Sequence, residues 1–234
     1  MRLTGNPGRD AGLLYVVLGV LGAFSILYVP GKLIAPGDAA VTARNILASE
    51  TLYRFSIVSG LISSALFVYL GRALYRLFQG VDREKAVWMV ALIAISVAIG
   101  LALTANDIAA LVVLRSSDVL AAFDPAEREA LALLFLRVGA AAIPLVMIFW
   151  GLWLFPFGTL VMRSGFVPRI LGVLLIVNGV AYLIATVMRL LVPDYADLMD
   201  KVLLLPELGE IWIMLWLVIK GVRAPAPAVR HPIG

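Results

Sequence analysis

The chain is a succession of long apolar segments separated by short polar connections. The apolar segments cover residues 11–29, 52–71, 86–114, 125–162, 170–191 and 206–222. About 20 mostly apolar residues suffice to cross the hydrocarbon core of a bilayer as a helix. The pattern therefore predicts an all-α, polytopic membrane protein: a six-transmembrane-helix bundle forming a single domain at 1–223, with a disordered cytoplasmic tail at 224–234.

Local signals add detail to this pattern. The fourth segment begins with Asp124 as an N-cap, followed by Pro125 and Glu127 in a capping box. Pro144 and Pro156 lie inside the same segment and are expected to kink it. Asp38 is expected to cap a short helix before the second span, and an apolar face at 195–203 predicts another short helix. The first and third outer loops are thus expected to carry short helices.

Charged residues are distributed unequally between the two predicted sides. With the N-terminus inside, 11 of the 19 lysines and arginines but only three of the 15 acids fall on the inner side. Basic residues in short loops favour the cytoplasmic face. The distribution predicts an N-in, C-in topology, and it explains the net charge of +4 without nucleic acid as a partner.

Composition excludes several chemistries. The chain is 62% hydrophobic and 15% charged, has no cysteine, and has a single histidine, His231, in the C-terminal tail. Haem ligation by paired histidines, iron–sulfur clusters, histidine-based zinc sites and thiol catalysis all lack their key side chains. We therefore expect no cofactor, no metal and no catalytic residues of these classes.

Several short motifs resemble one family over nearly the whole chain. They include Tyr53-Arg54, the run from Arg163 to Arg169 (RSGFVPR), Glu210, and Leu215-Trp216-Leu217. In these motifs the chain resembles DUF4386, a family of bacterial membrane proteins of unknown function. The resemblance implies six helices and a multi-pass location in the bacterial cytoplasmic (inner) membrane, and it implies no activity, substrate or catalytic residue.

Polar residues at membrane depth are the candidate functional residues. Glu210 is 10 residues from Lys220, which places it near the bilayer midplane, and Asn178 comes to a similar depth on the fifth span. A carboxylate at this depth costs at least about 2.5 kcal/mol unless it is paired or hydrated. The residues of the candidate outward-facing polar pocket are Glu210, Asn178, Arg54, Arg137, Asn106, Asp107 and Arg189.

Each of these residues also has an explanation that involves no function, and this explanation depends on its depth in the membrane. Four residues of that set, Arg54, Asp107, Arg137 and Arg189, are expected near the outer interface, where long side chains ordinarily reach the headgroups. For Glu210 the alternative is a buried pair that fixes helix packing. Gly19, Gly22, Gly172 and Gly179, together with serines at 59, 63 and 64, are expected to mark close helix contacts.

Three functional hypotheses remain open on sequence alone. The first is a protein that binds or transports a small solute, ion or lipid headgroup in the pocket around Glu210. The second is a non-catalytic structural or regulatory subunit, in which Glu210 is dry and paired and an exposed helix face serves association, for example as a homo-oligomer. The third is an intramembrane enzyme that uses carboxylates, for which the i, i+3 spacing of Glu207 and Glu210 on one helical face is weak support. It is the least favoured, because the chain lacks cysteine and its single histidine lies in the tail.

Overall fold

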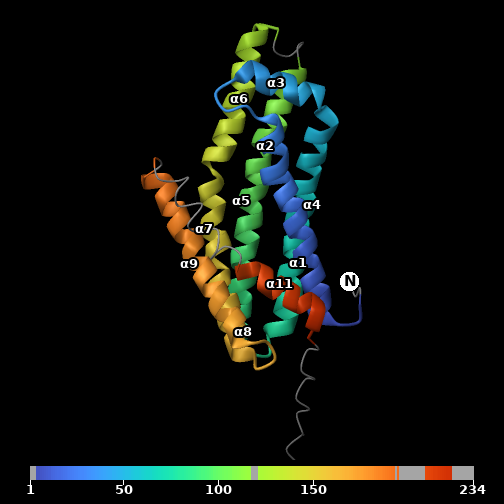
Figure 1. The fold of residues 1–234 in the computed structure, drawn as a ribbon, viewed down its shortest axis with the longest axis vertical. Coiled ribbons are helices and arrows are strands. Elements are labelled where there is room, and N and C mark those ends of the chain that lie inside the picture. The colour runs from blue at the N-terminus through green and yellow to red at the C-terminus, as the bar shows by residue number, and fades with distance from the viewer. Residues whose placement is uncertain (1–3, 117–120, 193, 195–208, 223–234) are drawn as a thin grey trace, which may run out of the picture.

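The computed structural model describes residues 4–116, 121–192, 194 and 209–222, and its regular elements in these ranges are helices. The fold class predicted from the sequence is confirmed as all-α. Figure 1 shows the elongated bundle. Its helices are α1 (Pro7–Ala23), η1 (Phe24–Tyr28), α2 (Val29–Leu33), α3 (Ala39–Ala48), α4 (Glu50–Phe78), α5 (Arg83–Arg115), α6 (Pro125–Ala141), α7 (Ile143–Leu152), α8 (Leu154–Ser164), α9 (Arg169–Leu191) and α11 (Gly209–Lys220).

Five helical stretches of the described residues are long and apolar enough to cross a membrane. They are Pro7–Leu33, Glu50–Phe78, Arg83–Arg115, Pro125–Ser164 and Arg169–Leu191. Each contains one of the first five predicted spans. The protein is therefore a multi-pass membrane protein in which large apolar side chains such as Val20 and Phe55 face outward.

The sixth predicted span corresponds to α11, which has 12 residues in the described part of the chain. At 1.5 Å per residue it measures about 18 Å, less than the roughly 30 Å of the hydrocarbon core. Residues 206–208 of that predicted span, the predicted short helix at 195–203 and the tail at 224–234 lie outside the described residues.

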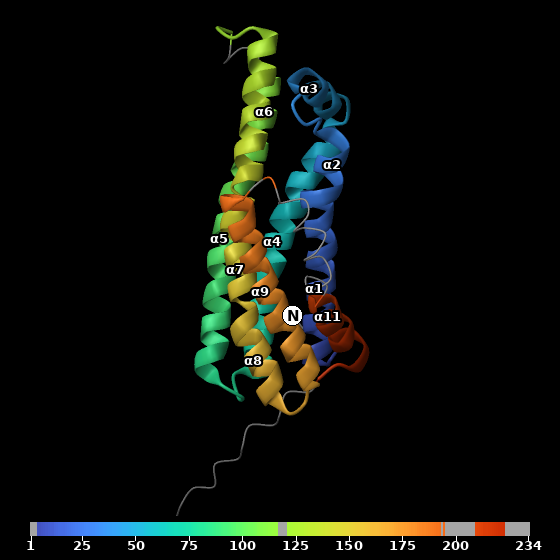
Figure 2. The same cartoon turned by 60° about the vertical axis from the view of Figure 1, so that its left-hand side comes forward.

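The helices are arranged as a ring that α11 closes. Helix α1 packs on α4, α4 on α5, α5 on α6, and α7 and α8 on α9, while α11 packs against both α9 and α1. Figure 2 shows α11 crossing between α9 and the start of α1, while α3 and the first turns of α6 lie at the opposite end. The N-terminal segment is tied to α11, because the Val222 N–H donates to Asn6 Oδ1 at 2.9 Å and the Gly8 N–H donates to the Val222 carbonyl at 3.0 Å.

A ladder of serine hydroxyls joins α4 to the first helix. Ser63, Ser59 and Ser56 donate to the carbonyls of Leu18, Leu21 and Ser25 at 2.8, 3.0 and 3.3 Å. The serine spacing of four and three residues puts all three hydroxyls on one face of α4. Interhelical hydrogen bonds of this kind hold membrane helices together where hydrophobic burial offers little.

The π-helix η1 explains one rung of this ladder. In η1 the Val29 N–H bonds to the Phe24 carbonyl, five residues back, and residue 30 is proline, which has no N–H. The Ser25 carbonyl therefore loses both possible helical donors. The Ser56 hydroxyl supplies the missing hydrogen bond from α4.

The fourth predicted span is interrupted twice, near the two prolines that the sequence marks. The backbone leaves the regular helix at Ala142, two residues before Pro144, and at Trp153, three residues before Pro156. Its N-terminus has the predicted capping box between Asp124 and Glu127. Asp38 also caps α3 as predicted, accepting from the Val41 N–H at 2.9 Å.

Glycines allow α7 and α8 to touch α9 backbone to backbone. A Cβ added at Gly158 would lie 2.6 Å from the Gly172 carbonyl oxygen, and one added at Gly151 would lie 2.8 Å from that of Gly179. The prediction of close contacts at Gly172 and Gly179 is confirmed. It is wrong for Gly19, where an added Cβ meets no atom within 4 Å.

Glycine-to-alanine substitutions distinguish two effects on stability: overpacking of a close helix contact and the higher helix propensity of alanine. Gly158→Ala should lower the midpoint of thermal unfolding, because overpacking a close contact costs about 1 to 3 kcal/mol. Gly19→Ala is the matched control, and it should leave the midpoint unchanged or raise it, since alanine favours a helix interior by about 0.5 to 1 kcal/mol. The midpoints of both variants are measured by thermal unfolding in the same detergent. Equal midpoints for Gly158→Ala and Gly19→Ala would contradict the close contact at Gly158.

The turn between α4 and α5 is organised by Asp82. Its Oδ1 accepts from the Lys85 N–H at 3.1 Å, and its Oδ2 lies 2.9 Å from Lys85 Nζ and 3.3 Å from Arg163 Nη1 on α8. The hydrogen bonds from Lys85, with the nearby charges of Lys85 and Arg163, lower the pKa of Asp82 below its ordinary value of 3.8. The ionised form therefore ties the start of α5 to the last turn of α8 at one end of the bundle.

The stabilisation from Asp82 should depend on pH in one direction. A carboxyl whose pKa is lowered on folding contributes fully above the unfolded pKa, and its contribution is lost as the pH falls through the lower folded value. Asp82→Asn keeps a side chain that can cap α5 but removes the charge. The unfolding midpoints of wild type and variant should differ at neutral pH and converge as the pH falls below 3.8. A gap that is constant with pH would contradict this role.

Candidate functional site

Two polar clusters lie inside the bundle, and the first surrounds Glu210. Helix α11 carries Glu210 to a point where Asn178 of α9 and Tyr15 of α1 meet it. Asn178 Nδ2 donates to Glu210 Oε1 at 3.0 Å, and the Tyr15 hydroxyl donates to Glu210 Oε2. Asn178 and Tyr15 are buried and Glu210 is half-buried. Three helices of the ring are thereby joined through one carboxyl group.

The cluster leaves one acceptor unused. Asn178 Oδ1 is buried and has no hydrogen-bond partner among the described residues. Gly209 allows the close approach that forms the cluster, because a Cβ there would lie 2.8 Å from the Leu174 carbonyl oxygen. The predicted proximity of Glu210 and Asn178 is therefore present, and the geometry is that of a hydrogen-bonded helix junction.

Substitutions of Glu210 distinguish hydrogen bonding from charge. Glu210→Leu leaves the Tyr15 hydroxyl and the Asn178 amide without an acceptor, and each stranded buried group costs about 1 to 3 kcal/mol. Glu210→Gln should retain most of the stability, because the Asn178 amide can turn and offer its unused oxygen to the new N–H₂ group. Thermal unfolding should therefore rank wild type close to Glu210→Gln and well above Glu210→Leu.

The exposed Glu84→Gln on α5 is the control for loss of a carboxylate, and it should unfold at the wild-type midpoint. Equal losses in Glu210→Gln and Glu210→Leu would show that the charge of Glu210, rather than its hydrogen bonds, supports the fold.

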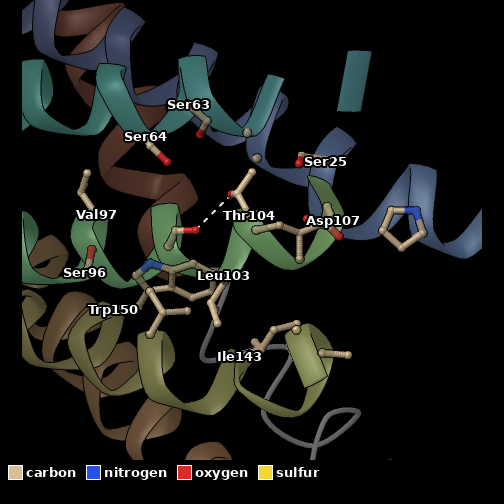
Figure 3. Close-up of a pocket in the computed structure, with 18 of the residues that line it drawn as sticks. Ser25, Ser63, Ser64, Ser96, Val97, Leu103, Thr104, Asp107, Ile143 and Trp150 are labelled. Carbon is tan, nitrogen blue, oxygen red and sulfur yellow. Dashed lines mark hydrogen bonds between the residues drawn. The ribbon is translucent and has the colours of Figure 1, made fainter. Parts of the chain in front are cut away.

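The second cluster lines a cavity of about 260 Å³ between η1, α4, α5, α6 and α7. Asp107, Thr104 and Ser96 reach it from α5, and Ser63 and Ser64 from α4. Figure 3 shows Ser25 and Asp107 facing one end of the cavity and Ser96 and Trp150 facing the other. Asp107 is 11 residues beyond Ser96, about 16 Å further along α5 and nearer to α3. The cavity is thus elongated along the bundle axis.

Small residues make the space for this cavity. Gly22, Gly60, Gly100 and Gly139 line it from four different helices, and most of the remaining wall is apolar. Two of the irregular backbone segments border it: Ser25 and Ile26 belong to η1, and Ala140 and Ile143 flank the interruption at Ala142. Such irregular turns often accompany functional sites in helices.

Asp107 is the charged residue among the described residues that line the cavity. Within the described part of the chain, no hydrogen bond or ion pair reaches its carboxylate, whereas its backbone carbonyl accepts from the Tyr53 hydroxyl at 3.0 Å. The Tyr53 bond fixes this turn of α5 against α4. The carboxylate is therefore held in place and is open to the cavity.

The structure separates the seven residues of the predicted pocket. Glu210 and Asn178 meet in the first cluster, and Asp107 lies on the cavity. Asn106 packs beside Gly139, and its Nδ2 donates to the Leu103 carbonyl at 3.2 Å. Arg189 lies on α9 about 16 Å along the helix from Asn178.

The two remaining arginines of that set lie on the outside of the bundle. Arg54 is exposed and pairs with Glu50 at 2.7 Å, as their spacing suggests, and Glu50 also pairs with Arg115 at 3.4 Å. Arg137 is exposed, beside the loop at Gly37. Exposed ion pairs contribute about 0 to 1 kcal/mol, so these arginines are peripheral to both clusters.

Several residues of both clusters could not be selected from the sequence. Tyr15 is a single aromatic in an apolar helix, and hydroxyls such as Ser96 and Thr104 are ordinary in membrane spans. The serines at 63 and 64 were interpreted as packing residues only, yet both line the cavity. No group of three or more His, Cys, Asp or Glu side chains in the described ranges is placed to hold a metal ion.

The chain matches one known protein family over most of its length. A sequence profile described as "Domain of unknown function (DUF4386)" matches residues 11–221 of the 234-residue chain. The chain belongs to the DUF4386 family. The predicted resemblance is thereby confirmed, and the match covers every described helix from α1 to α11 in whole or in part.

Among curated proteins, this DUF4386 chain is similar to an uncharacterised protein of Archaeoglobus fulgidus. The two are 34% identical over 74 residues, which is 32% of this chain and 43% of the relative. The similarity thus spans less than half of the relative's length. No solved structure matches the chain.

Proposed function

We propose that this protein binds a small solute in the cavity between η1, α4, α5 and α7, and that solute access is from the outer side of the membrane. The observation that carries the proposal is the cavity of about 260 Å³ with one unpaired carboxylate and several hydroxyls on an otherwise apolar wall. Binding pockets for small molecules combine these features: a concave apolar surface and a few fixed polar groups.

The cavity is supported as a site by the way its wall is built. Four glycines line the cavity, and a Cβ added at Gly100 would meet no described atom within 4 Å. The helix η1 and the interruption at Ala142 place irregular backbone beside the cavity. In hydrocarbon, irregular backbone is tolerated only where protein or a water-filled cavity satisfies it. The same features would allow a bound solute to contact polar groups that a regular helix conceals.

The proposed topology has six spans with both ends in the cytoplasm of a bacterial cell, in its inner membrane. The basic residues support it, since the turns at 79–82 and 165–168 lie at one end of the bundle, flanked by Arg76, Arg83, Arg163 and Arg169. In this topology α11, together with the chain before it, is the sixth span. The end that carries α3 and Asp107 then faces outward.

A structural or regulatory role is the second candidate, and the geometry of Glu210 favours it. A purely structural subunit requires a paired carboxyl group, and Tyr15 and Asn178 both donate to Glu210. We therefore propose different roles for the two clusters: the Glu210 cluster joins α1, α9 and α11, and the Asp107 cavity binds the solute.

Thiol labelling of intact cells tests the accessible cavity, because the native chain has no cysteine. Ser96→Cys at the deep end of the cavity should react with a small membrane-impermeant reagent added outside. Ile95→Cys is the matched control at the same depth, since Ile95 is 43% exposed on the outer surface of the bundle and should stay unlabelled in lipid. Adding Gly100→Phe to Ser96→Cys should suppress the labelling by filling the cavity.

Two connections serve as controls for sidedness. Ala121→Cys, beyond α5, should label from outside, and Gln79→Cys, after α4, should label only in opened cells. Reversed labelling of these two would contradict the topology. An unreactive Ser96→Cys in a folded protein with correct controls would contradict an outward-open cavity.

A further inference from the structure

From the lining of this cavity we infer the class of its ligand: an elongated organic monocation, with a protonated amine at one end and an apolar body. The inference rests on the proposed function, because it names what the cavity between η1, α4, α5 and α7 binds. It is carried by three features of the wall: its charge, its hydrogen-bonding capacity and its shape.

The charge of the wall has one sign. Asp107 contributes a carboxylate, and no lysine or arginine is among the described residues that line the cavity. The nearby basic side chains lie away from the cavity, since Lys32 lies over the Tyr28 ring at 5.9 Å and Arg137 is exposed beside Gly37. An anionic ligand would therefore meet a negative charge with no compensating cation.

Two hydroxyls of the wall, those of Thr104 and Ser63, have already donated their hydrogens. Thr104 donates its hydrogen to the Gly100 carbonyl at 3.0 Å, and Ser63 donates to the Leu18 carbonyl at 2.8 Å. Their remaining lone pairs can only accept. An ammonium group has three N–H donors and no acceptor, so it complements Asp107 and a neighbouring hydroxyl such as Thr104, one turn away on α5.

The shape of the cavity separates a polar end from an apolar body. Asp107 lies toward one end, and Phe67, Val97, Val146 and Trp150 form apolar wall elsewhere. The distance of about 16 Å along α5 between the levels of Ser96 and Asp107 leaves room for an extended molecule. A ligand with a terminal amine and a hydrocarbon or aromatic body fills both parts, whereas a bare metal ion would leave the apolar part empty.

Three probes of similar shape and different charge test the class of ligand. They are 2-phenylethylammonium, 2-phenylethanol and 3-phenylpropanoate, each titrated against the full chain in lipid nanodiscs. Binding is measured as the concentration-dependent rise of the unfolding midpoint, which reports affinity for the folded state. The ammonium should bind at least about tenfold more tightly than the alcohol, since charge-assisted hydrogen bonds are about twice as strong as neutral ones.

Two variants assign the preference to Asp107. Asp107→Asn should reduce ammonium binding to the level of the alcohol while leaving alcohol binding unchanged. Asp38→Asn is the matched control, because Asp38 lies outside the cavity and asparagine also caps a helix, so the ammonium preference should persist. Gly100→Phe should abolish binding of all three probes.

The outcomes separate this inference from the proposed function. Equal binding of ammonium and alcohol, lost in Gly100→Phe, would overturn the cation preference and leave the cavity as a binding site. Tighter binding of the propanoate, or an ammonium preference that survives Asp107→Asn, would also overturn it. Failure of all three probes would overturn the ligand class, and the labelling of Ser96→Cys would then decide separately whether the cavity is accessible.

Discussion

Hydrocarbon offers no hydrogen-bond partner to the backbone, and the arrangement of α1, η1 and α4 is a response to that constraint. Pro30 removes an N–H from the first helix, and the widened turn at η1 leaves the Ser25 carbonyl without a helical donor. In water this carbonyl would bind solvent. Here Ser56 of α4 donates to it, and Ser59 and Ser63 extend the contact. The serine ladder therefore sets how α1 and α4 lie together, and the cavity forms beside this contact.

The contact on the other side of the bundle is made differently. Between α7, α8 and α9, glycines pair across the interface so that backbone meets backbone, as at Gly158 and Gly172. Close glycine contacts gain dispersion energy over the whole interface and leave little space. One glycine of the cavity wall acts in the opposite way, because a Cβ added at Gly100 would meet no described atom within 4 Å. The same residue type thus closes one interface and opens another.

The two polar clusters differ in whether their hydrogen bonds are already made. At Glu210, donors from α1 and α9 occupy the carboxylate, and the result is a junction that holds α11 against the ring. At Asp107 no donor from the described helices reaches the carboxylate, which faces a cavity. A charged or hydrogen-bonding group that has no partner can bind a ligand, whereas a group whose hydrogen bonds are already made mainly stabilises the fold. This difference moves the candidate binding site from Glu210 to Asp107.

The sequence by itself determined the helical class, the membrane location and the helix ends that carry strong local signals. Apolar segments of 20 or more residues, the caps at Asp38 and Asp124, and the prolines at 144 and 156 act within one helix, so their consequences can be derived without knowing neighbours. The first five spans accordingly appear where the pattern predicts them, and the sequence also selected Glu210, Asn178 and Asp107 as polar residues that need a partner or a purpose.

Only the tertiary structure decided which of these residues meet. Position along a helix gives depth, but the direction in which a side chain points around the axis depends on how helices pack, and in an apolar span little periodicity records it. For this reason Glu210 and Asp107 were expected in one pocket, although they lie in different clusters. Tyr15, Ser96 and Thr104 could not be selected from the sequence as site residues. The role of a hydroxyl in an apolar helix depends on which neighbouring group the packing places beside it.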